Sequence, residues 1–180
     1  MPNRKEYISI FCGSRIGNDP LLRKIAYDFG YLLSTKYNLI YGGTNIGLMN
    51  DFANGVLNNK GKIIGIITEN FKNSGIMHEG LTKCILVPDM HKRKIEIYKR
   101  ADYFLVFPGG YGTLDEIFEV ITWKQLGLIN QPVVIFNYNG FFTTLFNHLE
   151  NTSMAGFTDS NIYEIVDICQ NYDELRHYFL

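Results

Sequence analysis

The stretch Tyr103-Phe104-Leu105-Val106-Phe107 runs directly into Pro108-Gly109-Gly110-Tyr111-Gly112-Thr113-Leu114-Asp115-Glu116. The first five residues have the length and composition of a buried parallel strand. After the glycines, apolar side chains recur at helical spacing, with Leu114, Ile117, Phe118 and Ile121 on one face. The glycines therefore lie on a strand-to-helix turn, where backbone N–H groups and the helix dipole can hold a phosphate group.

Strand-like and helix-like segments alternate outward from this turn along the chain. The expected strands are Tyr7–Cys12, Leu39–Tyr41, Lys62–Ile67, Leu81–Val87, Tyr103–Phe107, Pro132–Phe136 and Ile162–Val166. The expected helices are Pro20–Thr35, Gly47–Asn58, Asp89–Arg100, Thr113–Leu126, Phe141–Glu150 and Tyr172–Leu180. Strands separated by helices predict βαβ units. We expect an α/β fold: a Rossmann-like, doubly wound parallel sheet of about seven strands with helices on both faces, in one domain over residues 1–180.

Two other expected strands also end in glycine, at Gly13-Ser14 and at Gly42-Gly43. Ligands of open parallel sheets bind at the carboxyl ends of the strands. Because glycine lets a backbone approach a ligand closely, three glycine turns on one rim predict a single cleft. We expect this cleft to take a phosphate-bearing ligand.

The usual nucleotide-binding motifs, and the nucleophile motif of α/β-hydrolases, are absent from the sequence. The first turn reads Gly13-Ser14-Arg15-Ile16-Gly17, which is not G-x-G-x-x-G, and no acid follows the second strand to hold a ribose. There is no G-x-x-x-x-G-K-[ST] P-loop and no G-x-S-x-G nucleophile elbow. These absences argue against a dinucleotide-dependent enzyme, a P-loop enzyme and an α/β-hydrolase.

A second chemical cluster is Met90-His91-Lys92-Arg93-Lys94, and Asp89 is placed to cap its helix. Cations in a first helical turn oppose the helix dipole and cost about 0.3–1 kcal/mol each when exposed. A bound anion would offset that cost. A solvated basic face is the other interpretation of the cluster.

Glu116 has two interpretations. Thr113-Leu114-Asp115-Glu116 matches a capping box, in which the glutamate reaches back to the backbone at the start of the helix. The same carboxylate lies one turn into the helix, close to whatever the glycine turn binds, and could do chemistry there.

Composition narrows the partners and the setting. The formal net charge of -1 predicts no general attraction to nucleic acid or to anionic membranes, and no segment is apolar for long enough to span a bilayer. Cys12, Cys84 and Cys169 are far apart and border apolar runs, which predicts buried free thiols and a cytoplasmic location. No metal-ligand spacing appears.

The expected helix over Thr113–Leu126 carries apolar residues beyond one stripe, among them Val120 and Trp123. A helix that is apolar on more than one face needs a second partner. We therefore predict a homodimer packed through this helix.

Together these segments resemble the LOG (Lonely Guy) family, formerly labelled "possible lysine decarboxylase". Pro108 to Glu116 matches its P-G-G-x-G-T-x-x-E signature at every fixed position, and Met90 to Lys94 matches M-H-x-R-K. Further similar elements are Cys12-Gly13-Ser14, Tyr41-Gly42-Gly43, Gly47-Leu48-Met49, Thr122-Trp123-x-Gln125-Leu126-Gly127 and Asn139-Gly140-Phe141-Phe142. The segment Asn70–Glu79 departs from the family, with Gly75 where many members have a substrate-contacting glutamate.

The resemblance implies hydrolysis of the N-glycosidic bond of a nucleoside 5'-monophosphate, to free base and ribose 5-phosphate. It implies Glu116 and Arg93 as the catalytic pair, with no cofactor and no metal. The residues implied for substrate and phosphate are Gly109, Gly110, Tyr111, Gly112, Thr113, Lys94, Met90, Gly13, Ser14, Gly42, Gly43 and Thr122. The alternative is a carrier without turnover, because some proteins of similar fold and glycine turn bind molybdenum cofactor. The old decarboxylase label implies pyridoxal phosphate, but no lysine has a recognisable Schiff-base context.

Overall fold

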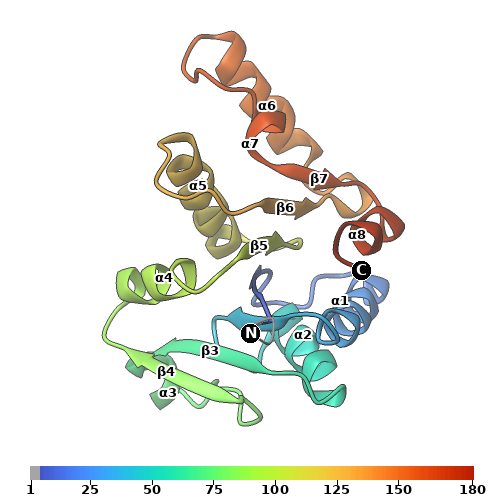
Figure 1. The fold of residues 1–180 in the computed structure, drawn as a ribbon, viewed down its shortest axis with the longest axis vertical. Coiled ribbons are helices and arrows are strands. Elements are labelled where there is room, and N and C mark those ends of the chain that lie inside the picture. The colour runs from blue at the N-terminus through green and yellow to red at the C-terminus, as the bar shows by residue number, and fades with distance from the viewer. Residues whose placement is uncertain (1–4) are drawn as a thin grey trace.

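The structure is a computed structural model that describes residues 5–180 (Figure 1). Its strands are β1 (Tyr7–Phe11), β2 (Asn38–Tyr41), β3 (Ile63–Thr68), β4 (Lys83–Val87), β5 (Tyr103–Val106), β6 (Val133–Phe136) and β7 (Asp167–Cys169). Its helices are α1 (Pro20–Leu33), α2 (Gly47–Asn58), α3 (Glu69–Asn73), α4 (Met90–Tyr98), α5 (Tyr111–Gln125), the 3₁₀ turn η1 (Tyr138–Gly140), α6 (Thr143–Met154), α7 (Ile162–Ile165) and α8 (Tyr172–Phe179).

The seven strands form one parallel sheet in the order β4-β3-β2-β1-β5-β6-β7. The chain begins at the centre with β1, builds outward to β4, and then returns to the other side of β1 with β5. This reversal makes the space between the carboxyl ends of β1 and β5 the topological switch point, where doubly wound sheets bind ligands. The expected fold class is confirmed.

Helices cover both faces of the sheet, and each face has its own apolar core. On one face α1, α2 and α8 pack on the strands, and on the other α4, α5, α6 and α7 do so. Figure 1 shows α1, α2 and α8 gathered on one side of the sheet and α4 and α5 on the other. The turns at the carboxyl ends therefore follow strands that are packed on both faces.

One expected strand is wrong. Residues 162–166 contain the short helix α7, and the seventh strand follows it as β7. Asn161 caps α7 by accepting a hydrogen bond from the backbone N–H of Tyr163 at 3.2 Å. Ile162 and Ile165 are both buried, so their spacing of three fits one helical turn. An apolar run this short does not distinguish the two periods.

The expectation of three buried thiols is wrong at Cys84, which is exposed, whereas Cys12 and Cys169 are buried and free. Cys84 lies on β4, the edge strand, where it and Leu86 face outward. Within residues 5–180, no helix has both the length and the apolar character needed to cross a bilayer.

Candidate active site at the carboxyl edge of the sheet

The glycine turn after β5 leaves a helix start with free donors. Helix α5 begins at Tyr111, and its N-cap residue, Gly110, has an extended backbone and supplies no side chain to cap it. The first backbone bond at this end runs from Leu114 N–H to Gly110 O at 3.1 Å. The N–H groups of Tyr111, Gly112 and Thr113 thus have no acceptor among residues 5–180, as an anion site at a helix start requires.

The turns after β1 and β5 lie side by side, because these strands are neighbours and Gly13 N–H donates to Pro108 O at 3.1 Å. A cavity of about 880 Å³ opens at this switch point. Six expected site residues line it: Gly13, Ser14, Gly109, Gly110, Tyr111 and Gly112. Its other walls, which sequence reasoning missed, include Asp19, Leu22, Leu48, Tyr138 and Phe141.

Two of the glycines are required by close approach. A Cβ at Gly109 would lie 2.1 Å from Oγ1 of Thr113 and 2.8 Å from N of Gly13, so only glycine lets the two turns meet. A Cβ at Gly42 would lie 1.8 Å from Nη2 of Arg93. Gly42 therefore makes room for a guanidinium group. Gly43 adopts a left-handed φ of 77° beside Gly65.

Arg93 is a buried cation that α4 projects across the sheet edge. It is 6% exposed, and its Nε donates to Ile66 O at 2.9 Å. Its guanidinium lies 5.8 Å from the ring centroid of Phe71 in α3. Asp89 caps α4 as expected, accepting from Lys92 N–H at 2.8 Å. Burial lowers the pKa of Arg93, and the negative charge of Glu116 opposes that shift.

Glu116 is a carboxylate without a direct partner: it has no hydrogen bond or ion pair within residues 5–180. Burial raises its pKa to about 7, against the opposing effect of the Arg93 charge. The charge of Glu116 also adds to burial in raising the pKa of Cys12, at the end of β1. Glu116 is thus close enough to Arg93 and to the central strand ends for charge coupling, and it remains free to meet a ligand.

The capping-box interpretation of Glu116 is wrong. The helix begins two residues earlier than expected, so Thr113 is a helical residue and Gly110 holds the capping position. Thr113 is buried against Gly109 instead of capping the helix. Glu116 therefore lies well inside α5, beyond reach of the orphan N–H groups that a capping box satisfies.

The structure gives Lys94 and Met90 definite surroundings. Lys94 pairs with Asp115 at 3.2 Å and with Glu119 at 2.9 Å, tying α4 to α5. Two carboxylates already neutralise its charge, so direct attraction of a phosphate is not its main contact. Met90 is 42% exposed rather than part of the core, and its sulfur lies 4.0 Å from Nη1 of Arg93.

Thr122 and Phe71 depart most from expectation. Thr122 is exposed and lies nine positions beyond Thr113 on α5, roughly 13 Å along the helix axis. Within a single chain it is therefore too far from the glycine turn to contact the same phosphate. Phe71 was not expected at the site. It belongs to the short helix α3, in the segment that departs from the family, and no periodicity marks it.

The fold and this edge define a class: a Rossmann-like protein with a helix start whose N–H groups lack acceptors within residues 5–180 at the switch point, and with a buried arginine and a half-buried glutamate near it. A family model described as "Possible lysine decarboxylase" matches residues 49–179. The chain belongs to this family, the Lonely Guy (LOG) family, as its named relatives also show.

Two relatives carry the same name, cytokinin riboside 5'-monophosphate phosphoribohydrolase. The one from Rhodococcoides fascians is 35% identical over 168 residues, covering 92% of this chain and 85% of its own. The one from Arabidopsis thaliana is 37% identical over 169 residues, covering 93% and 79%. Among solved structures, the molybdenum cofactor binding protein of Rippkaea orientalis superposes with a TM-score of 0.72 at 23% identity, covering 97% of this chain and 95% of its own. This last likeness concerns the fold alone.

Proposed function

We propose that the protein hydrolyses the N-glycosidic bond of a nucleoside 5'-monophosphate, of the AMP or cytokinin riboside monophosphate type. The products are the free base and ribose 5-phosphate. Membership of the family and the names of both relatives support an N-glycosyl hydrolase. In the reaction the bond from ribose C1' to the base nitrogen breaks, water adds its oxygen to C1', and the base leaves with a proton.

The observation that carries the proposal is Glu116: a half-buried carboxylate without a direct partner within residues 5–180, with a pKa of about 7, one turn along α5 from the glycine turn. Cleavage passes through an oxocarbenium-like ribose with positive charge near C1'. A carboxylate at that point stabilises the charge and removes a proton from the attacking water. A pKa near neutrality suits a base that works near pH 7.

The glycine turn holds the other end of the substrate. The free N–H groups of Tyr111, Gly112 and Thr113 face an anion with the positive end of the helix dipole behind them. Gly112 and Glu116 are one turn apart on the same face of α5, and nothing lies within 4 Å of where a Cβ of Gly112 would be. A nucleotide with its phosphate on the turn would therefore have its ribose on the side of α5 that carries the carboxylate.

Arg93 completes the arrangement as a fixed positive charge. Its bond to Ile66 O and its fit against Gly42 hold it in one place without neutralising it. It keeps the ionised form of Glu116 accessible despite burial, because its charge opposes the rise in pKa. The rate should therefore rise as pH passes about 7 and Glu116 ionises.

A substrate panel tests the function. Steady-state rates are measured for purine and pyrimidine monophosphates, with the matching nucleosides as controls that lack the phosphate. We expect free base from at least one monophosphate, and much slower release from its nucleoside because the helix-start contacts are lost. Equal rates for both would contradict the role of the glycine turn.

A carrier without turnover, such as one for molybdenum cofactor, is the second candidate, favoured by the large cavity beyond the glycine turn. A carrier needs no carboxylate with a pKa of about 7 next to a buried arginine. Binding of a monophosphate without release of base, at any pH between 6 and 9, would favour the carrier.

We also propose a homodimer packed through α5, on residues other than those first expected. Val120 is fully buried in the protein's own core, and Trp123 packs on Tyr98 with ring centroids 5.1 Å apart. Phe118 was expected on the inward face of the helix, but it is 40% exposed. Away from Tyr111, which lines the cavity, the other exposed apolar side chains on α5 are Leu126 and, just after the helix, Leu128. They give the C-terminal half of α5 an apolar outer face.

A further inference from the structure

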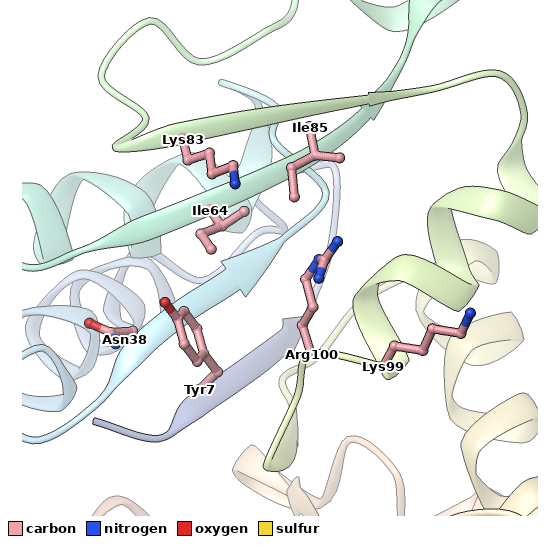
Figure 2. Close-up of a pocket in the computed structure, with 7 residues that line it drawn as sticks. All are labelled: Tyr7, Asn38, Ile64, Lys83, Ile85, Lys99 and Arg100. Atoms are coloured by element: carbon pink, nitrogen blue, oxygen red, sulfur yellow. The ribbon is translucent and has the colours of Figure 1, made fainter. Parts of the chain in front are cut away.

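A second cavity, of about 490 Å³, lies at the other end of the sheet (Figure 2). Its walls come from the beginnings of β1, β2, β3 and β4 and from the end of α4, whereas the glycine turns follow the carboxyl ends of the strands. It shares no residue with the cavity at the switch point. Whatever it binds is therefore separate from the proposed substrate.

The cavity is lined by three cations, Lys83, Lys99 and Arg100, and by no carboxylate. Within residues 5–180, the side-chain amines of Lys83 and Lys99 have no hydrogen bond or ion pair. Arg100 pairs through Nη2 with Glu96, but its Nε is buried and has no acceptor within the same residues. A buried donor without an acceptor is costly, so it indicates a missing hydrogen-bond partner.

The remaining walls are Tyr7, Asn38 and two apolar side chains. Ile64 and Ile85 are partly buried side chains of the sheet face that α4 leaves uncovered. In Figure 2, Lys83 and Ile85 extend from β4 and Arg100 rises from the end of α4 toward them, while the amine of Lys99 turns outward. An anion in this space would meet charge from Lys83 and Arg100 and an apolar surface from the isoleucines.

We propose that this cavity binds a small organic phosphate with a flat apolar body. The two cations that face this space, Lys83 and Arg100, match a phosphate dianion better than a carboxylate monoanion, because attraction grows with ligand charge. The planar guanidinium of Arg100 presents donors in the fork that phosphate oxygens accept. Ile64 and Ile85 would then cover one side of the apolar body. The proposal does not depend on the proposed function.

The test uses 1-naphthyl phosphate as probe on the full chain, followed through backbone amide shifts in NMR spectra. We expect saturable shifts at Ile64, Lys83 and Ile85, with weaker binding of 1-naphthoate. Lys83→Gln should weaken binding at these residues roughly fivefold, and Arg100→Gln more than tenfold. Neither substitution should affect any probe-induced shifts at Tyr111–Thr113. The control Lys72→Gln, at an exposed residue, should change neither the shifts at the second cavity nor those at the glycine turn.

Glu96→Gln should change the affinity in the opposite direction. It frees Arg100 of its competing carboxylate, so the affinity for 1-naphthyl phosphate should rise, a result that mere disturbance of α4 would not produce. Shifts confined to the glycine turns, or equal affinity in wild type and Lys83→Gln, would overturn the proposal. Shifts at these residues that follow protein concentration instead of probe would also overturn it, because a second chain would then cover the cavity.

Discussion

Glu116 is a carboxylate held where burial disfavours its charge. Most buried acids are stabilised by direct partners, but this one has none within residues 5–180, and Arg93 acts on it only through space. A carboxylate held in this way lowers the stability of the folded protein. Groups of this kind are typical of functional sites, where a shifted pKa serves the reaction. In the proposed function, this carboxylate distinguishes a catalytic site from one that only binds the nucleotide.

The stability of the protein should therefore fall as Glu116 ionises. Its pKa of about 7 exceeds the usual 4.5, so the folded state binds this proton more tightly and loses stability as pH rises between these values. Glu116→Gln should match wild type near pH 4 and exceed it at pH 8 by on the order of 3 kcal/mol. Chemical denaturation at both pH values measures this, with exposed Glu164→Gln as control. No gain at pH 8 would contradict the raised pKa.

Substitution of Gly42 tests whether the position of the Arg93 guanidinium matters for activity. Gly42→Ala should displace the guanidinium, because the added Cβ would come within 1.8 Å of Nη2, and misplacement of this kind should lower kcat roughly a hundredfold. Arg93→Met removes the charge without a clash. In the Arg93→Met background, Gly42→Ala should add little further loss. Additive losses in kcat would show that Gly42 acts by another route.

Among the helices and strands, α5 matters most, because the residue at which it begins determines which N–H groups and side chains are available to a ligand. A helix that began at Thr113 would have been capped by its own side chains, which would leave Glu116 as part of the cap. The helix begins instead at Tyr111 with a bare glycine cap, which frees three N–H groups for a ligand. The motif could be located from sequence, but its helix start could not, because glycines fit both a turn and a first helical turn.

Gly112→Ala separates helix stability from ligand binding. Alanine is a better helix former, and nothing lies within 4 Å of its Cβ, so stability should rise by roughly 0.5–1 kcal/mol. The same methyl group intrudes above the free N–H groups, so KM for the monophosphate should rise. Exposed Asn151→Ala in α6 should stabilise without changing KM. An unchanged KM for Gly112→Ala would place the phosphate elsewhere.

Elements were predictable where pattern and length agreed. Asp89 was identified as a cap from the sequence, and the buried strand before Pro108 was assigned correctly. Residues 162–166 failed because Ile162 and Ile165 satisfy either period over so short a run. Phe71 could not be found because α3 is a five-residue helix without a buried side chain, and only its tertiary position brings it to Arg93.

At the scale of the molecule, topology brings the parts together. The alternation of strands and helices was enough to predict a doubly wound parallel sheet, and the order β2-β1-β5 sets the glycine turns side by side. The sequence did not predict which neighbours each residue of these turns would contact. Gly42 was expected at the phosphate, yet in the structure it accommodates Arg93. The exposure of Cys84 likewise depends on β4 being an edge strand.

The proposed dimer is tested by charge on the outer face of α5. Wild type should have twice the chain mass of 20.7 kDa by light scattering at micromolar concentration. The double substitution Phe118→Glu with Leu126→Glu should give a monomer, because carboxylates would be buried without partners. Met154→Glu changes another exposed apolar residue, on α6, and should leave the dimer intact. A monomeric wild type would refute the proposal.

The central claim is that Glu116 acts in cleavage of an N-glycosidic bond, and product release from AMP tests it most directly. Adenine and ribose 5-phosphate are quantified after incubation with wild type and with Glu116→Gln at pH 8. We expect equimolar products from wild type and a rate lowered by roughly a hundredfold or more in the variant. Turnover of Glu116→Gln at the wild-type rate, or no base released by wild type from AMP or any other monophosphate, would contradict the claim.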